Sequence, residues 1–99
     1  MIKIPLQKTP AQTFKIKLDG QNCEMRVYYR FGNTYLDLIC NGQEIQKGAI
    51  CRNRDYIITI AQSAFSGNLF FLDMLGENDP LYNGFGERWR LLYRAADEL

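Results

Sequence analysis

The stretch Phe14-Lys15-Ile16-Lys17-Leu18-Asp19-Gly20-Gln21-Asn22-Cys23-Glu24-Met25 decides the fold. Apolar and polar side chains alternate on both sides of Asp19-Gly20, which is the period of a strand with one buried face. Asp19-Gly20 is typical of a type I′ turn, because both central positions of that turn require positive φ. We therefore predict a tight antiparallel hairpin. Its cross-strand pairs are Ile16–Cys23 and Phe14–Met25 on the buried face and Lys15–Glu24 on the outer face.

Two further turns extend this pattern along the chain. Asn41-Gly42 is a second hairpin pair, and it places Leu38 opposite Ile45. In the turn formed by residues 30–33, Gly32-Asn33 suits a left-handed backbone geometry. Only two short segments could form a single helical turn, and these are Ala61–Phe65 and Ala95–Leu99.

The other predicted strands lie toward both ends of the chain. They are Ile2–Leu6, Tyr35–Cys40, Tyr56–Ala61, Leu69–Asp73 and Trp89–Tyr93. Pro5 lacks a backbone N–H, so the first of these strands is expected at the edge of a sheet. About seven short strands, with turn signals roughly every 8 to 12 residues, predict an all-β fold. It is either a small antiparallel sandwich or a partly open barrel, as a single β domain over residues 1–99.

Composition excludes several classes of function. Twelve basic and eleven acidic residues leave a net charge of +1, which argues against binding driven by a field of one sign, as to nucleic acids or membrane surfaces. The sequence has no histidine and so lacks the commonest general base and metal ligand. We therefore expect no enzymatic activity, no catalytic residue, no metal site, no cofactor and no small-molecule substrate. The chain is expected to work by contact.

The cysteines and the N-terminus bear on the compartment. Cys23, Cys40 and Cys51 are odd in number and show no CxxC spacing, which indicates buried thiols in a reducing compartment. The opening five residues are followed by polar ones rather than by the apolar region of a signal peptide. The longest aliphatic or aromatic run, Leu69–Leu72, is too short to span a bilayer. A protein made and kept in a cytoplasm, or in an assembly formed there, is expected.

The segment of residues 74–87 does not fit the strand pattern. It has three glycines and one proline, yet it also carries Leu75, Leu81, Tyr82 and Phe85. A long loop with such side chains is typical of an ordered, functional segment. We predict that Leu75–Glu87 is the main partner-facing element, with Tyr82 and Phe85 exposed on it; the alternative is that both rings close the core. The candidate partner-binding residues are Leu81, Tyr82, Phe85, Trp89, Arg52 and Arg54.

The stretch Asp73–Glu87 is acidic, which raises the question of a cation site. Its carboxylates are Asp73, Glu77, Asp79 and Glu87. The oxygen-ligand spacing of a calcium loop is absent, because Met74, Leu75 and Pro80 interrupt it. Carboxylates that cap turns are therefore the favoured interpretation.

Arginines interleaved with aromatic residues offer an alternative function. Such a patch on a β surface is how barrels that bind single-stranded nucleic acid work, provided that the residues converge on one face. The set consists of Arg52, Arg54, Arg88, Arg90 and Arg94 with Tyr28, Tyr82 and Trp89. Acidic residues are nearly as numerous and fall close by along the chain, which favours solvated faces and local ion pairs.

Several short motifs follow one another in a fixed order along nearly the whole chain. They are Ile4-Pro5-Leu6, Pro10-Ala11-Gln12, Leu18-Asp19-Gly20-Gln21-Asn22-Cys23, Tyr35-Leu36-Asp37-Leu38, Asn41-Gly42, Cys51-Arg52-Asn53-Arg54, Gly67-Asn68-Leu69-Phe70-Phe71-Leu72-Asp73, Asp79-Pro80, Gly84-Phe85-Gly86 and Arg88-Trp89-Arg90-Leu91-Leu92-Tyr93. In their order, spacing and total length the chain resembles the phage baseplate plug proteins, a family named from a cyanophage tail baseplate. The tail Arg94–Leu99 beyond the last motif is the main departure.

The resemblance implies a function that the residues alone do not name. It implies a virion structural protein, encoded by a phage or a prophage, in the baseplate of a contractile tail near the central hub. The implied partners are other tail or baseplate proteins, held by protein–protein contact after assembly in the host cytoplasm. It implies neither an enzyme nor a cofactor. Binding of single-stranded nucleic acid by a β-barrel remains the alternative.

Overall fold

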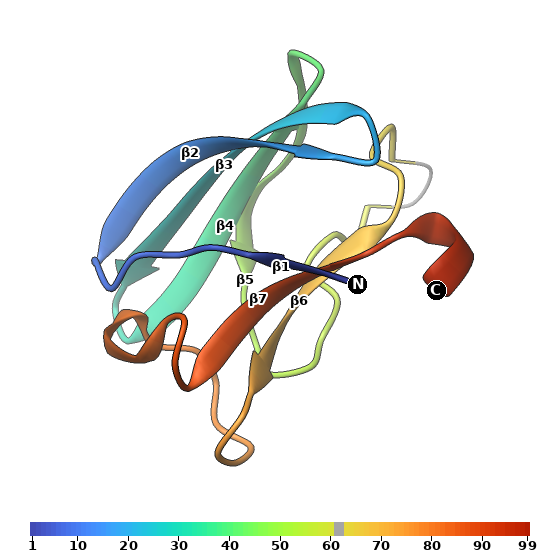
Figure 1. Cartoon of the computed structure of the whole chain (residues 1–99). Helices are drawn as coiled ribbons and strands as arrows, with labels where there is room; N and C mark the ends of the chain where they lie inside the picture. Colours follow the sequence, from blue (N-terminus) through green and yellow to red (C-terminus); the bar gives the residue numbers. More distant parts are fainter. Residues whose placement is uncertain (61–62) are drawn as a thin grey trace.

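Two antiparallel sheets face each other in this protein (Figure 1). The structure is a computed structural model that describes residues 1–60 and 63–99. The strands of the described residues are β1 (Ile2–Ile4), β2 (Ala11–Leu18), β3 (Gln21–Arg30), β4 (Asn33–Cys40), β5 (Gln43–Ile50), β6 (Asn68–Asp73) and β7 (Trp89–Arg94), with the short 3-10 helices η1 (Tyr82–Gly84) and η2 (Ala96–Glu98). Their order is β1-β7-β6 in one sheet and β2-β3-β4-β5 in the other. The fold is therefore a small all-β sandwich that is not closed into a barrel.

The β2–β3 hairpin has the predicted register. Asp19 and Gly20 have φ values of 50° and 76°, as a type I′ turn requires. The predicted pairs Ile16–Cys23, Phe14–Met25 and Lys15–Glu24 are all present. The first strand is shorter than predicted, yet it lies at the edge of its sheet as Pro5 indicated.

The β4–β5 hairpin departs from the predicted register. Asn41 and Gly42 form the expected turn, with φ values of 51° and 79°. Leu38, however, pairs with Gln46 and not with Ile45, because the ladder is bulged on both sides of this pair. Farther along β5, Gly48 has a φ of 63°, and its N–H donates to Asp37 Oδ1 at 2.7 Å. A side chain of the neighbouring strand thus holds the irregular part of β5.

Replacing Gly42 by Val is expected to lower the free energy of unfolding by about 1 kcal/mol or more, because a β-branched residue resists positive φ. A Cβ at this position meets no atom within 4 Å, so the loss reports backbone strain alone. Urea unfolding measures it. Gly42→Asn is the matched control and should lose less, because Asn tolerates left-handed geometry. Equal losses in the two variants would contradict this explanation.

Residues 56–60 do not form a strand, so the prediction of a strand over Tyr56–Ala61 is wrong for these residues. Amide side chains form hydrogen bonds here that a neighbouring strand would otherwise form. Asn68 Oδ1 accepts from the N–H of Ile58, and Asn68 Nδ2 donates to the carbonyl of Ile58, both at 3.0 Å. Gln46 accepts from the N–H of Thr59, also at 3.0 Å. Ala61 lies outside the described residues, as does the start of the helical turn considered for 61–65. The C-terminal helical turn is present as η2.

The core lies between the two sheets and draws on both. Leu18, Leu38, Phe71 and Leu91 are among its fully buried side chains. The hydroxyl of buried Tyr93 lies 2.9 Å from Asp19 Oδ2 and 2.8 Å from the carbonyl of Ser66, so β7 is tied to the β2–β3 turn. Burial raises the pKa of this hydroxyl to about 12.

The three cysteines are buried free thiols, as predicted. Burial raises the pKa of Cys23 to about 11 and raises that of Cys51 as well, so both thiols are protonated at neutral pH. None of the helices in the described ranges 1–60 and 63–99 has the length and apolar character needed to cross a membrane.

Candidate interaction surface

The turn of residues 74–79 is held by the ion pair between Asp73 and Arg88. Arg88 donates from Nε and Nη2 to the two carboxylate oxygens of Asp73, each at 2.9 Å. The same oxygens accept the backbone N–H groups of Leu75 and Asn78, also at 2.9 Å. The indole of Trp89 donates to the carbonyl of Asn78 at 3.0 Å. Asp73 therefore caps the turn, which is the role that the sequence favoured for the acidic residues of this segment.

Electrostatics keep Asp73 ionised although its side chain is buried. Hydrogen bonds from Arg88 hold the pKa of the Asp73 carboxyl well below its usual range, against the opposing effect of desolvation. The two backbone amides act in the same direction as Arg88. The same ion pair raises the pKa of Arg88. The guanidinium of Arg88 also lies 4.5 Å from the centre of the Trp89 ring, so it is fixed on two sides.

The lowered pKa of Asp73 predicts a loss of stability in acid. Because the folded pKa lies below the usual value of about 3.9, the unfolded chain binds the proton more readily. The stabilisation is therefore present above about pH 4 and is lost as the pH falls further. We expect the difference in unfolding free energy between the wild type and Asp73→Asn to shrink between about pH 6 and about pH 2. Urea unfolding at both values measures it, and a constant difference would contradict the assignment.

Phe85 and Trp89 lie in the core and not on the surface, so the predicted exposure of Phe85 is wrong. Phe85 is 2% exposed, and its ring stacks on that of Phe71 with the centroids 5.5 Å apart. Trp89 is 4% exposed. A Cβ at Gly84 would lie 2.5 Å from the Trp89 ring, so only glycine permits this close approach. The approach turns Phe85 inward, as the alternative interpretation of the loop had it.

Leu81 and Tyr82 remain accessible beside the turn that joins β3 and β4 (Figure 1). Thr34, which pairs with Tyr29, donates from its hydroxyl to the carbonyl of buried Pro80 at 2.7 Å. The Tyr29 and Tyr82 rings meet edge to face, with centroids 5.6 Å apart. This contact and the hydrogen bond place the start of η1 over the end of the hairpin.

Phe31 is the functional candidate that sequence reasoning missed. It forms the tip of the β3–β4 turn, and 93% of it is exposed. The turn was predicted to use Gly32-Asn33, but Phe31 and Gly32 take the left-handed positions, with φ values of 49° and 84°. The signal in the sequence was a bulky residue directly before the glycine of a two-residue turn. We call Tyr29, Phe31, Leu81 and Tyr82 the apolar end surface.

The two candidate arginines have different neighbours. Arg52 Nη1 is 3.5 Å from Asp79 Oδ2, and the N–H of Asn53 donates to Asp79 Oδ1 at 2.9 Å. Arg52 is thus attached to the turn of residues 74–79. Arg54 instead lines a hollow of about 270 Å³ with Tyr56, Phe70 and Arg94 among other residues.

The residues of the nucleic-acid alternative do not form one set, because Tyr28 lies on the four-stranded sheet, apart from the strand residues Arg90 and Arg94 of β7. Tyr28 belongs to β3, where Arg26 lies 4.6 Å from the centre of its ring. Arg94 belongs to β7 and donates to the Tyr56 hydroxyl at 3.0 Å. Arg88 is engaged by Asp73, and Trp89 is buried. This arrangement does not favour the alternative, which requires one converging face.

No curated protein matches the chain. The family model described as "Cyanophage baseplate Pam3 plug gp18" matches residues 1–96 of the 99, which confirms the resemblance seen in the motifs. The all-β sandwich, its free thiols and the surface just described belong to a chain of that family. The protein is therefore a member of the phage baseplate plug family, with a structural role in the tail baseplate of the virion.

Proposed function

We propose that the chain acts in the baseplate of a contractile tail by protein–protein contact, near the central hub, and that the apolar end surface is one of its contacts. Membership of the plug family supports the location. The exposed side chains of Phe31 and Leu81, with half-buried Tyr82, support the mode of action. The protein works without catalysis or a cofactor, as a single β domain assembled in the host cytoplasm together with other tail proteins.

The conformation of Phe31 is the observation that carries this proposal. A bulky residue in the left-handed region costs about 1–2 kcal/mol relative to glycine, and strain of this kind gathers at functional sites. Phe31 adopts a φ of 49° while 93% of the residue is exposed, so the ring does not stabilise the isolated chain through burial. An aromatic side chain inserted in a pocket of a partner contributes strongly to binding. Such a pocket would offset the strain.

The other candidate residues have distinct roles. Leu81 and Tyr82 widen the contact area. Arg52 forms an ion pair with Asp79 and is thereby attached to the neighbouring turn of residues 74–79. Phe85 and Trp89 support η1 from the core and do not reach the surface. We propose Arg54 as part of a separate contact on the three-stranded sheet, next to Phe70.

Replacing Phe31 by Asn separates stability from assembly. The variant has an Asn-Gly turn, which is the preferred pair for a two-residue hairpin. We expect its free energy of unfolding to be unchanged or raised by up to about 1 kcal/mol. Its incorporation into purified tails should fall about tenfold or more, because the anchoring ring is lost. Complementation of a deletion mutant, followed by immunoblotting of purified particles, measures incorporation, and cross-linking to hub proteins tests the location.

Leu75→Ala is the control for this experiment. Leu75 is also highly exposed, but it lies on the turn of residues 74–79 and outside the apolar end surface. It should be incorporated like the wild type. Equal losses for Leu75→Ala and Phe31→Asn would refute the assignment of the surface. Absence of the wild-type chain from purified particles would refute the proposed function itself.

A further inference from the structure

On the outer edge of β2, the backbone N–H and C=O groups have no hydrogen-bonded neighbouring strand within residues 1–60 and 63–99. The N–H of Asn41 donates to the carbonyl of Asn22 at 2.9 Å, and the N–H of Asn22 donates to Asn41 Oδ1 at 3.0 Å. The backbone of Asn22 is therefore turned toward β4, and that of its partner Lys17 is turned away from β3. Backbone groups alternate in direction along an antiparallel ladder, so the N–H and C=O groups of Lys15 and Thr13 also point away from β3. β2 is the terminal strand of its sheet.

An apolar groove runs beside this edge. It has a volume of about 570 Å³ and is lined by β2 and by the connection from β1, which runs along the same side of the molecule (Figure 1). Leu6, Phe14 and Ile16 line it, pack against the core and are only partly buried. The sandwich is thus open at this seam. Three apolar side chains there remain partly in contact with solvent.

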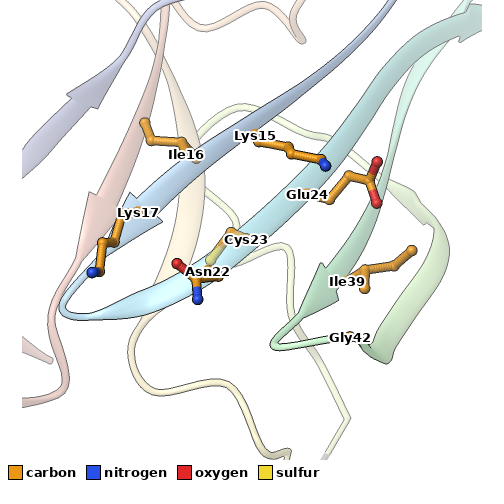
Figure 2. Close-up of a pocket in the computed structure, with 8 residues that line it drawn as sticks. All are labelled: Lys15, Ile16, Lys17, Asn22, Cys23, Glu24, Ile39 and Gly42. Atoms are coloured by element: carbon orange, nitrogen blue, oxygen red, sulfur yellow. The ribbon is translucent and has the colours of Figure 1, made fainter.

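The outer side of the same strand is hollowed and basic. A second hollow, of about 550 Å³, is lined by Lys15, Lys17, Glu24 and Ile39 among others. Figure 2 shows the side chains of Lys15 and Glu24 pointing toward each other, with Lys17 nearer the β2–β3 turn. Among the described residues, neither lysine forms an ion pair within 4 Å. Two positive charges therefore flank the free edge, with one carboxylate nearby.

We propose that β2 accepts an extended strand of a partner protein along this edge. Main-chain hydrogen bonds to Thr13, Lys15 and Lys17 would hold the strand, as in other cases of strand addition. The strand would carry carboxylates at two alternate positions opposite the lysines. An apolar residue between them would face Ile16 and the groove, because alternate side chains point to opposite faces. That this strand belongs to another baseplate protein rests on the proposed function.

The two lysines also determine which kind of strand can pair with the edge of β2. Lysines on an edge strand oppose pairing between identical chains. A second copy of this chain, paired along β2, would bring like charges together, whereas an acidic strand would neutralise them. The charge on the edge therefore favours a different chain that carries acidic residues.

Lys15→Pro tests the edge in assembled particles. Proline removes the outward N–H of residue 15 and leaves the β2–β3 ladder intact. Lys15→Thr is the matched control, because it loses the charge but keeps the N–H. Both variants should melt within a few degrees of the wild type. We expect Lys15→Pro to be incorporated about tenfold less than Lys15→Thr. Equal incorporation of the two folded variants overturns the proposal.

A second experiment uses the isolated chain and does not require assembled tails. The isolated chain is titrated with the peptide acetyl-Glu-Val-Glu-Val-Glu-amide and followed by amide chemical shifts. We expect shifts centred on Thr13, Lys15 and Lys17 that weaken with salt, and smaller ones with acetyl-Lys-Val-Lys-Val-Lys-amide. Equal responses to the two peptides, or none, overturn the proposal. If these shifts appear while the wild-type chain is absent from tails, strand addition stands and the proposed function fails.

Discussion

Replacing Phe85 by Ala is expected to lower the free energy of unfolding by about 3–5 kcal/mol, the usual cost of deleting a buried aromatic ring. Phe85 is 2% exposed and stacks on Phe71, and its backbone bridges to that of Trp89. The cavity left by the ring would lie at the end of the core, beneath η1. Urea unfolding followed by the fluorescence of Trp89 measures the loss.

Tyr82→Ala is the control in the same segment. Tyr82 is only partly buried and meets Tyr29 edge to face, so its loss should cost less than half as much. If Phe85→Ala unfolds within about 1 kcal/mol of the wild type, its ring lies outside the core and the exposure predicted from the sequence is correct after all. Similar losses for the two variants would remove the distinction between them.

The parts of the fold that the sequence predicts well are those fixed by local chemistry. Asp19-Gly20 determines both the turn and the register of β2 and β3, because a two-residue loop leaves a single pairing. The strands β6 and β7 are also found within one residue of their predicted limits. In each case the alternation of side chains and the turn residues point to the same structure.

Other parts depend on contacts between residues that are distant in the sequence. The bulge in β5 coincides with a hydrogen bond from Gly48 to Asp37, which no local pattern announces. Residues 56–60 have the composition of a strand, but the side chain of Asn68 takes the place of a ladder partner. Propensity describes a residue's fit to a sheet, and tertiary contacts decide whether a sheet position is available.

The candidate surface was predicted only in part, for a related reason. The sequence correctly singled out residues 74–87 as an ordered segment with apolar side chains, and Leu81 is exposed and Tyr82 half-buried there. It could not show which ring turns inward, because the direction of Phe85 depends on the approach of Gly84 to Trp89. Phe31 was overlooked because it looked like an ordinary residue of a short turn.

Gly84→Ala should lower the free energy of unfolding by about 1–3 kcal/mol, the usual cost of overpacking a core. The added Cβ would lie 2.5 Å from two carbons of the Trp89 ring and 3.2 Å from Cβ of Arg88. Trp89 has little room to move, because its indole N–H is bonded to Asn78 and its ring carries the Arg88 guanidinium. The strain is therefore expected to spread into the Asp73–Arg88 pair and the turn that this pair holds.

Gly76→Ala provides the matched comparison, because it adds the same methyl group to the same loop. There the nearest atoms to the new Cβ are Arg88 Nη2 and Asp73 Oδ2, each at 3.5 Å, which is ordinary contact. Its unfolding free energy should stay within about 0.5 kcal/mol of the wild type. Hydrogen exchange at the amides of Leu75 and Asn78 adds a local measurement, since both donate to Asp73. Faster exchange in Gly84→Ala alone shows that the close approach to Trp89 supports the turn, and equal exchange in the two variants shows that it does not.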